Sequence, residues 1–280
     1  MTKSNGKTAL ITGSTDGVGR MVAERLGADG WRILVHGRDH ERGKDVVATI
    51  KKAGGAAEFI AADLASLAEV RKLAAAVQKT TSRLDLLINN AGIGSGGPEG
   101  KRQTSRDGYE LRFAVNYLSG FLLTHLLLSL LKKSAPARIV NVASLGQQAI
   151  DFSDVMLAQD YSGMRAYRQS KLAQILFTLD LAPALAGAGI TVTALHPATF
   201  MDTKMVREFG TPMSTVAEGA DAILKLAAAP ELEGKTGLYF NGQSEGQANA
   251  QAYDAQAREE LRTLSLKLTG LSAPRASARR

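Results

Sequence analysis

Tyr167 and Lys171 stand four residues apart in a stretch with a strong helical pattern. Residues at this spacing project from the same face of a helix, so the phenol and the ammonium are expected to lie close together. A tyrosine phenol ionises near pH 10, and an ammonium about 4 Å away is strong enough to lower that pKa by roughly two to three units. The pair can therefore serve in proton transfer, although so short a pattern also arises by chance.

Two further polar segments follow apolar runs that are typical of buried strands. Ser144 comes just after the run 139–142, and Asn89-Asn90-Ala91-Gly92 follows the run 86–88. The carboxyl ends of parallel strands meet at one edge of an open sheet, where such sheets bind their ligands. The serine and the asparagines are therefore expected at the same edge.

A glycine-rich turn, TGSTDGVG at residues 12–19, lies between the first apolar run and a helical pattern. Glycine lets the backbone approach a pyrophosphate closely, while free N–H groups and the positive end of the helix stabilise its charge. The spacing differs from the common G-x-G-x-x-G, and a turn without a ligand is the alternative. Its position directly after the first strand favours a nucleotide site.

Arg38 follows the end of the second apolar run. Counting from the glycine turn assigns the ribose contact to Asp39, which would indicate NAD. Arg38 is closer to the strand end, and a guanidinium there pairs with the 2′-phosphate of NADP. The sequence therefore favours NADP over NAD, with a solvated loop arginine as the alternative.

The composition excludes several other kinds of chemistry. The 280 residues include no cysteine, so disulfides, thiolate metal sites, iron–sulfur clusters and cysteine nucleophiles are ruled out. His36 and His40 straddle a strand end and a loop, so no metal site is predicted. Redox chemistry therefore needs a bound cofactor.

The net charge of +7 raises the question of a nucleic-acid or anionic membrane partner. Three of the positive charges, Arg275, Arg279 and Arg280, fall in the last residues of the chain. Nowhere does a basic stripe with interleaved aromatic residues occur. The sequence therefore predicts no nucleic-acid partner.

Short apolar runs alternate with amphipathic stretches, which predicts crossover units and parallel strands that are buried on both faces. The expected fold is α/β, a doubly wound parallel sheet of the Rossmann type with about seven strands and helices on both faces. Strands are expected at 9–11, 33–35, 58–61, 86–88, 139–142, 192–195 and 237–240, and helices at 19–26, 41–53, 67–80, 117–132, 167–186 and 215–229.

One domain is expected over residues 1–245, because no repeat or linker divides the chain. Residues 246–272 are expected to form a C-terminal helical extension, and 273–280 a disordered basic tail. The polar segment 1–7 predicts a cytoplasmic protein. The longest apolar run, 117–131, is shorter than a bilayer requires, so it is interpreted as a buried helix and no membrane span is predicted.

In their order along the chain, these motifs strongly resemble those of the short-chain dehydrogenase/reductase family. They are the glycine turn, the Asn-Asn-Ala-Gly segment, Asn116 in a helix, Ser144 at a strand end and the Tyr167–Lys171 pair. The resemblance covers about residues 7–242. The segments 36–39, 166–173, 195–197 and 268–271 are most similar to retinol-dehydrogenase-like members, many of which prefer NADP.

The resemblance implies a role for each catalytic residue. Tyr167 is the general acid and base, Lys171 lowers its pKa and binds the nicotinamide ribose, and Ser144 stabilises charge on the substrate oxygen. Asn116 holds a water that links the lysine to solvent, with a structural hydrogen bond as the alternative. The implied cofactor-binding residues are Gly13, Ser14, Thr15, Gly17, Val18, Gly19, Arg38, Asp63, Leu64, Asn89, Ala91, Gly92, Tyr167, Lys171, Pro197 and Thr203.

The sequence departs from the family pattern at Ala198, where Pro-Gly is common, and this leaves the placement of the nicotinamide open. Residues 199–215 are rich in methionine and phenylalanine and include Gly210 and Pro212, which indicates an apolar lid. A partly buried connection between helix and loop is the alternative. Phe152 and Tyr161 are expected to extend a lipophilic pocket.

These residues together predict an NADP-dependent oxidoreductase that transfers a hydride between nicotinamide and a lipophilic carbonyl or alcohol. The alternatives are an NADP-binding redox sensor or scaffold without turnover, and an epimerase or dehydratase of the same fold. The apolar helix and the Tyr167 helix correspond to the usual subunit interface of the family, so a homodimer or homotetramer is expected. The identity of the substrate and the direction of the reaction are not encoded in these patterns.

Overall fold

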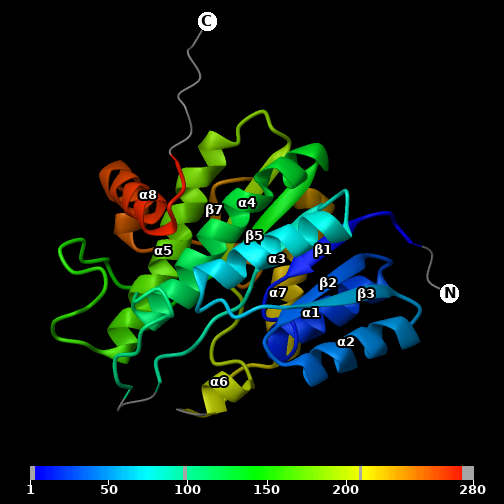
Figure 1. Ribbon diagram of the computed structural model, residues 1–280, viewed down its shortest axis with the longest axis horizontal. Coiled ribbons are helices and arrows are strands. Elements are labelled where there is room, and N and C mark those ends of the chain that lie inside the picture. Colours follow the sequence, from blue (N-terminus) through cyan, green and yellow to red (C-terminus); the bar gives the residue numbers. More distant parts are fainter. Residues whose placement is uncertain (1–3, 97–99, 208–209, 273–280) are drawn as a thin grey trace, which may run out of the picture.

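The computed structural model describes residues 4–96, 100–207 and 210–272, so the predicted basic tail and Phe209 lie outside the described residues (Figure 1). Its core is an eight-stranded sheet with the order β3-β2-β1-β4-β5-β6-β7-β8. The predicted doubly wound sheet is therefore confirmed. All seven predicted strands are present and parallel, and the sequence missed only β8 (Ser244–Glu245), which pairs antiparallel with β7.

The strands are β1 (Thr8–Ile11), β2 (Arg32–Gly37), β3 (Ala56–Ala61), β4 (Leu86–Asn89), β5 (Ala137–Val142), β6 (Ile190–His196) and β7 (Leu238–Asn241). The helices are α1 (Gly17–Ala28), α2 (His40–Lys52), α3 (Leu67–Thr80), α4 (Ser119–Lys133), α5 (Gly163–Ala184), α6 (Lys204–Arg207), α7 (Val216–Ala228) and α8 (Ala255–Thr269). Short helical turns η1, η2 and η3 span Phe113–Leu118, Pro230–Leu232 and Ala250–Tyr253.

Two hydrophobic clusters show how the helices cover the sheet. Buried side chains of α3, α4, α5 and α8 pack with one face, and those of α1, α2 and α7 pack with the other. The chain runs outward from β1 to β3 and then returns to pair β4 with β1, so the strand order reverses between β1 and β4. In sheets of this kind the ligand crevice lies at the carboxyl ends of the strands beside that reversal.

The predicted buried helix is longer than the sequence suggested. The π-helical turn η1 runs directly into α4, and together Phe113–Lys133 form 21 residues that are long and apolar enough to cross a membrane by length and composition. The prediction that this segment is too short was therefore wrong. Inside the fold, however, 67% of its most apolar window is buried, which is typical of a core helix.

Helix α5 starts earlier than the predicted residue 167. Ser162 is its N-cap, and the Ser162 side chain accepts a hydrogen bond from the Arg165 backbone N–H. A capping serine is a signal that the sequence contains, and it places Tyr167 and Lys171 in the second and third turns of a long helix rather than at its frayed start. The catalytic pair is therefore held on a rigid element.

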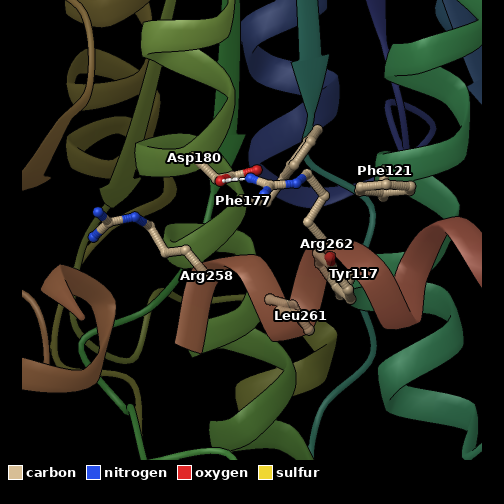
Figure 2. A pocket seen from close by; sticks show the side chains of 7 residues that line it. All are labelled: Tyr117, Phe121, Phe177, Asp180, Arg258, Leu261 and Arg262. Carbon is tan, nitrogen blue, oxygen red and sulfur yellow. Dashed lines mark hydrogen bonds and ion pairs between the residues drawn. The ribbon is translucent and has the colours of Figure 1, made fainter. Parts of the chain in front are cut away.

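The predicted C-terminal helix is α8, and it packs on α5. Figure 2 shows a small pocket between these helices and the start of α4, where the rings of Tyr117, Phe121 and Phe177 approach Leu261 and Arg262 of α8. The Tyr117 hydroxyl is 2.7 Å from the Ser265 hydroxyl, and Arg262 forms an ion pair with Asp180. Helix α8 is thus fixed to the body of the protein.

Candidate active site

Tyr167 and Ser144 lie together beyond the carboxyl end of β5. Ser144 follows that strand by two residues and is 8% exposed. A Cβ on Gly146 would lie 3.5 Å from the Ser144 Oγ and 3.8 Å from Tyr167 Cε1, so the two side chains meet beside this glycine. Burial raises the pKa of Tyr167, and the contact with Ser144 opposes that shift. Two of the predicted catalytic side chains are therefore in direct contact.

Lys171 lies on the same face of α5, with its Nζ 5.9 Å from the centre of the Tyr167 ring. Its amine donates hydrogen bonds to the Val142 carbonyl at 2.8 Å and to Gln174 Oε1 at 3.0 Å. Burial lowers the pKa of Lys171 to about 7. The lowering of the Tyr167 pKa by this amine, which the resemblance implies, stays a prediction.

Asn116 sits in the π-helical turn η1 and is 2% exposed. Its side-chain amide accepts from the Ile93 N–H at 2.8 Å and donates to the Ile93 carbonyl at 3.1 Å and to the Ser170 hydroxyl at 2.9 Å. These contacts are the structural hydrogen bonds that the sequence left as the alternative. They connect η1, the segment after β4 and the catalytic helix, and π-helical turns often mark functional sites.

The Asn-Asn-Ala-Gly segment follows β4 as predicted, but its two asparagines point in different directions. The Asn89 side chain donates to Thr124 and Asn141 inside the core, at 3.1 and 2.8 Å, so it is not directed at the glycine turn. Asn90, which the resemblance did not assign, donates to the carbonyls of Thr12 and Gly13 at 2.8 and 3.1 Å. Asn90 therefore holds the glycine turn against β4.

The glycine turn has the backbone shape that a side chain would prevent. Gly13 and Gly17 have φ angles of +64° and +54°. A Cβ on Gly13 would lie 2.9 Å from the Ala91 Cα, and a Cβ on Gly19 would lie 2.4 Å from Asn90 Nδ2. Part of the glycine requirement thus comes from packing against the segment after β4, and not only from the approach of a phosphate.

Two groups in the turn are already engaged. Asp16 caps α1, and its carboxylate accepts from the Gly17 N–H at 2.8 Å. The Ser14 hydroxyl donates to the Ile11 carbonyl and accepts from the His36 N–H, at 2.8 and 3.0 Å. The N–H groups of the turn were expected to be free for a phosphate, but the Gly17 N–H already donates to the Asp16 side chain.

Several other side chains in the implied cofactor set serve packing. Val18 and Leu64 are 9% and 7% exposed and belong to the two hydrophobic clusters. Thr15 faces Gly37, where a Cβ would lie 2.5 Å from the Thr15 methyl carbon. Asp63 accepts from the Ala65 N–H at 3.1 Å and keeps a partly exposed carboxylate. Of these four, Asp63 and Thr15 offer polar groups, a carboxylate and a hydroxyl, on side chains that are not fully buried.

Arg38 is exposed at the carboxyl end of β2, as the sequence predicted. Asp39 is the N-cap of α2, and its carboxylate accepts from the N–H groups of Glu41 and Arg42 at 3.0 and 3.1 Å. This capping role gives a structural reason for an aspartate at this position. The sequence missed Arg42, whose guanidinium lies 3.0 Å from Asp16 and so adds a second cation beside the turn.

His36 is 2% exposed at the end of β2, and its Nδ1 accepts from the Gly13 N–H at 3.1 Å. Burial lowers the pKa of His36 to about 4, so the ring is neutral near pH 7. The remaining nitrogen, Nε2, is buried, and the Ala62 backbone lies close enough to the ring to raise its pKa against the effect of burial.

The residues present fit a nicotinamide dinucleotide along this edge. A Cβ on Gly17 would lie 3.4 Å from the Thr203 methyl carbon, so the turn and the start of α6 face each other. A Cβ on Gly92 would lie 3.3 Å from Asn116 Oδ1 and 3.4 Å from Lys171 Nζ. Gly17 therefore keeps the backbone accessible at the glycine turn, and Gly92 does so beside Lys171.

The segment after β6 has features of both an apolar lid and a partly buried connection between helix and loop, the two interpretations that the sequence left open. His196 Nε2 is 3.1 Å from the Thr199 hydroxyl, directly beside Pro197 and Ala198. The described part of the segment contains the short helix α6, which is a helix–loop connection. Phe200 and Met213 nevertheless remain 47% and 73% exposed, as expected for an apolar lid.

The Tyr161 hydroxyl is engaged in a polar cluster, and the expected part of its ring in a lipophilic pocket stays a prediction. The hydroxyl accepts from Arg112 at 2.7 Å and donates to Glu110 at 3.2 Å. Arg112 and Glu110 are 4% and 1% exposed. Phe152 is partly buried against the hydrophobic core. Tyr161 thus belongs to a buried polar cluster that the sequence analysis missed, because its members are brought together only by the fold.

Comparison with known proteins places this geometry in a family. The family model described as short chain dehydrogenase matches residues 7–214. Human retinol dehydrogenase 13 is 37% identical over 291 residues, covering 96% of this chain and 86% of the relative.

Two solved structures share the fold. An uncharacterised protein from Mycobacterium paratuberculosis has a TM-score of 0.79 at 28% identity and covers 97% of both chains. The RhlG/NADP active-site complex from Pseudomonas aeruginosa has a TM-score of 0.67 at 29% identity, covering 85% of this chain and 95% of that one. Together with the Tyr167, Lys171, Ser144 and Asn116 geometry, these matches show that the chain belongs to the short-chain dehydrogenase/reductase family and is a retinol-dehydrogenase-like oxidoreductase.

Proposed function

We propose that this protein uses NADP to interconvert lipophilic carbonyl compounds and alcohols, with Tyr167 as the general acid and base. The observation that carries the proposal is that the Tyr167 and Ser144 side chains meet beside Gly146, with a buried lysine on the helix of Tyr167. The cofactor, when bound, supplies or accepts the hydride. The exposed apolar side chains Phe200 and Met213 and the name of the retinol dehydrogenase relative support a lipophilic substrate.

In this proposal each residue acts at a stated atom. Tyr167 gives its phenolic proton to the carbonyl oxygen during reduction and accepts it back during oxidation. Ser144 donates a hydrogen bond to the same oxygen, which stabilises the charge that develops there. Lys171 binds the nicotinamide ribose and stabilises the phenolate after the proton has left.

Arg38 supports the choice of NADP over NAD. Its guanidinium is exposed at the end of β2, next to the glycine turn, and Asp39 is occupied as the N-cap of α2. A guanidinium at this strand end favours a 2′-phosphate. The protein complex with NADP among the structural neighbours supports the same choice.

The proposal is tested by NADPH oxidation with decanal and retinaldehyde, compared with NADH. We expect the wild type to consume NADPH in preference to NADH, and Tyr167→Phe to lose activity by about 100-fold or more, because the acid that protonates the oxygen is gone. Tyr109→Phe is the matched control, because its hydroxyl contacts the Leu268 carbonyl.

Each alternative predicts a different result in this assay. A protein that binds NADPH but consumes it with no carbonyl compound would be a sensor or scaffold. An epimerase or dehydratase would convert its substrate without net loss of NADPH. A Tyr167→Phe variant as active as the wild type would exclude the proposed role of the tyrosine.

A further inference from the structure

The loop that carries Ser144 has no regular secondary structure between the end of β5 and residue 150. Its backbone is held by side chains instead. The Ser144 carbonyl accepts from Gln147 Nε2 at 2.8 Å and from the Tyr239 hydroxyl at 3.1 Å. The position of Ser144 thus depends on groups that fix this carbonyl.

The C-terminal extension holds both ends of this loop. The Asn249 N–H donates to Gln147 Oε1 at 2.7 Å, which directs the other end of the Gln147 amide at Ser144. Gln251 forms two hydrogen bonds with one residue, since its Oε1 accepts from the Ile150 N–H at 2.6 Å and its Nε2 donates to the Ile150 carbonyl at 3.0 Å. Ile150 is 5% exposed and packs in the core.

This part of the extension is itself rigidly supported. Gln251 lies in η3, which leads into α8, and Arg258 of α8 donates to the Ala252 carbonyl at 2.8 Å. Helix α8 is in turn fixed to the body by the Tyr117–Ser265 and Asp180–Arg262 contacts, of which the ion pair is drawn in Figure 2. A chain of contacts therefore runs from α8 to the loop of Ser144.

We propose that Gln147 and Gln251 are positioning residues, through which the C-terminal extension sets the place of the Ser144 hydroxyl at the reacting oxygen. This inference rests on the proposed function. The Ser144 Oγ accepts from the Gly146 N–H at 3.0 Å, so its own hydrogen stays available to donate. A donor of this kind is effective only when it is held at the position of the developing charge.

The test is Gln251→Met, which keeps the length of the side chain and removes both hydrogen bonds to Ile150. We expect kcat for decanal to fall about tenfold, because small displacements of a positioned group cost large factors in rate. The Kd for NADPH is expected to stay within about twofold, because Gln251 touches none of the residues of the proposed cofactor site. Gln256→Met, on an exposed residue at the start of α8, is the matched control.

A second readout separates positioning from general stability. The contact with Ser144 lowers the pKa of Tyr167, so a displaced Ser144 lets that pKa rise. Reduction requires the protonated phenol, and the alkaline limb of the pH profile of kcat is therefore expected at higher pH in Gln251→Met. If Gln251→Met does not fold, Gln147→Met replaces it in the test, because it removes the hydrogen bonds of the Gln147 side chain with Ser144 and Asn249. Gln251→Glu, which keeps the acceptor for the Ile150 N–H, is expected to recover part of the lost kcat.

Three results would overturn the inference. They are a kcat within about twofold of the wild type, an unshifted alkaline limb, or equal losses of kcat and NADPH affinity that vanish at a lower temperature. Failure of the proposed function looks different, because then the wild type itself reduces none of the carbonyl compounds.

Discussion

At the residue scale, Lys171 shows the sharpest conflict between burial and charge. The side chain is 5% exposed and its pKa falls to about 7, whereas a lysine in an unfolded chain has a pKa near 10.4. Folding therefore costs free energy at every pH at which Lys171 is protonated in the unfolded chain, because the folded protein binds that proton more weakly. This cost is fully present below about pH 7 and disappears as the pH rises toward the unfolded pKa.

The free energy of unfolding should reveal this cost when wild type and Lys171→Met are compared without cofactor. We expect the difference in favour of Lys171→Met to shrink by about 2 kcal/mol between pH 7 and pH 9, as measured by urea unfolding. The donors lost by Val142 and Gln174 lower the stability of the variant equally at both pH values. Lys267→Met, at an exposed lysine of α8, is the control. A difference that stays constant with pH would contradict this account.

At the element scale, a buried ion pair connects three segments that form the site. Arg112 donates to the carbonyls of Gly94 and Ser95 after β4, at 2.9 and 2.6 Å, and its partner Glu110 accepts from the Phe113 N–H at the start of η1. Tyr161, which contacts both, stands immediately before the N-cap of α5. The cluster therefore fixes the Asn116 turn and the catalytic helix relative to the segment after β4.

Arg112→Met is expected to lower the free energy of unfolding by about 3 to 5 kcal/mol, because it leaves the buried Glu110 carboxylate without its positive partner and two carbonyls without their donor. Thermal and urea unfolding measure this directly. Arg106→Met provides the control, since Arg106 is exposed and lies 3.8 Å from Asp63, and the expected loss there is below about 1 kcal/mol. Equal losses in the two variants would show that the cluster does not fix the segments.

At the scale of the whole molecule, α8 covers the helix that was expected to pair with a second copy. Most residues of α5 are buried within the single chain, and α8 packs against α5. A homodimer through α4 and α5 would have to accommodate α8, which packs on α5. The homodimer or homotetramer stays a prediction.

We therefore expect light scattering on the purified chain to show no dimer that uses the α5 face. Leu261→Asp, at a residue of α8 that is 1% exposed, is expected to loosen the helix and to increase association through the uncovered apolar surface. Glu259→Gln, on the exposed side of α8, is the control. Crosslinks between the α5 helices of two wild-type chains would contradict this expectation.

The sequence by itself determined the fold class, all seven parallel strands and the order of the catalytic motifs. Strand patterns and the Tyr167–Lys171 spacing depend on local periodicity, which is readable along the chain. The sequence also placed Ser144 and the Asn-Asn-Ala-Gly segment at one edge of the sheet, because the carboxyl ends of parallel strands meet at that edge.

Only the tertiary structure decided which neighbours each side chain uses. Asn89 turned into the core and Asn90 to the glycine turn, although both stand in the same motif. Gln251 and Ile150 are 101 residues apart in sequence, and so no local pattern indicates that they meet. Burial depends in the same way on the packing of distant elements, which is why the lowered pKa of Lys171 followed from the fold and not from its spacing to Tyr167.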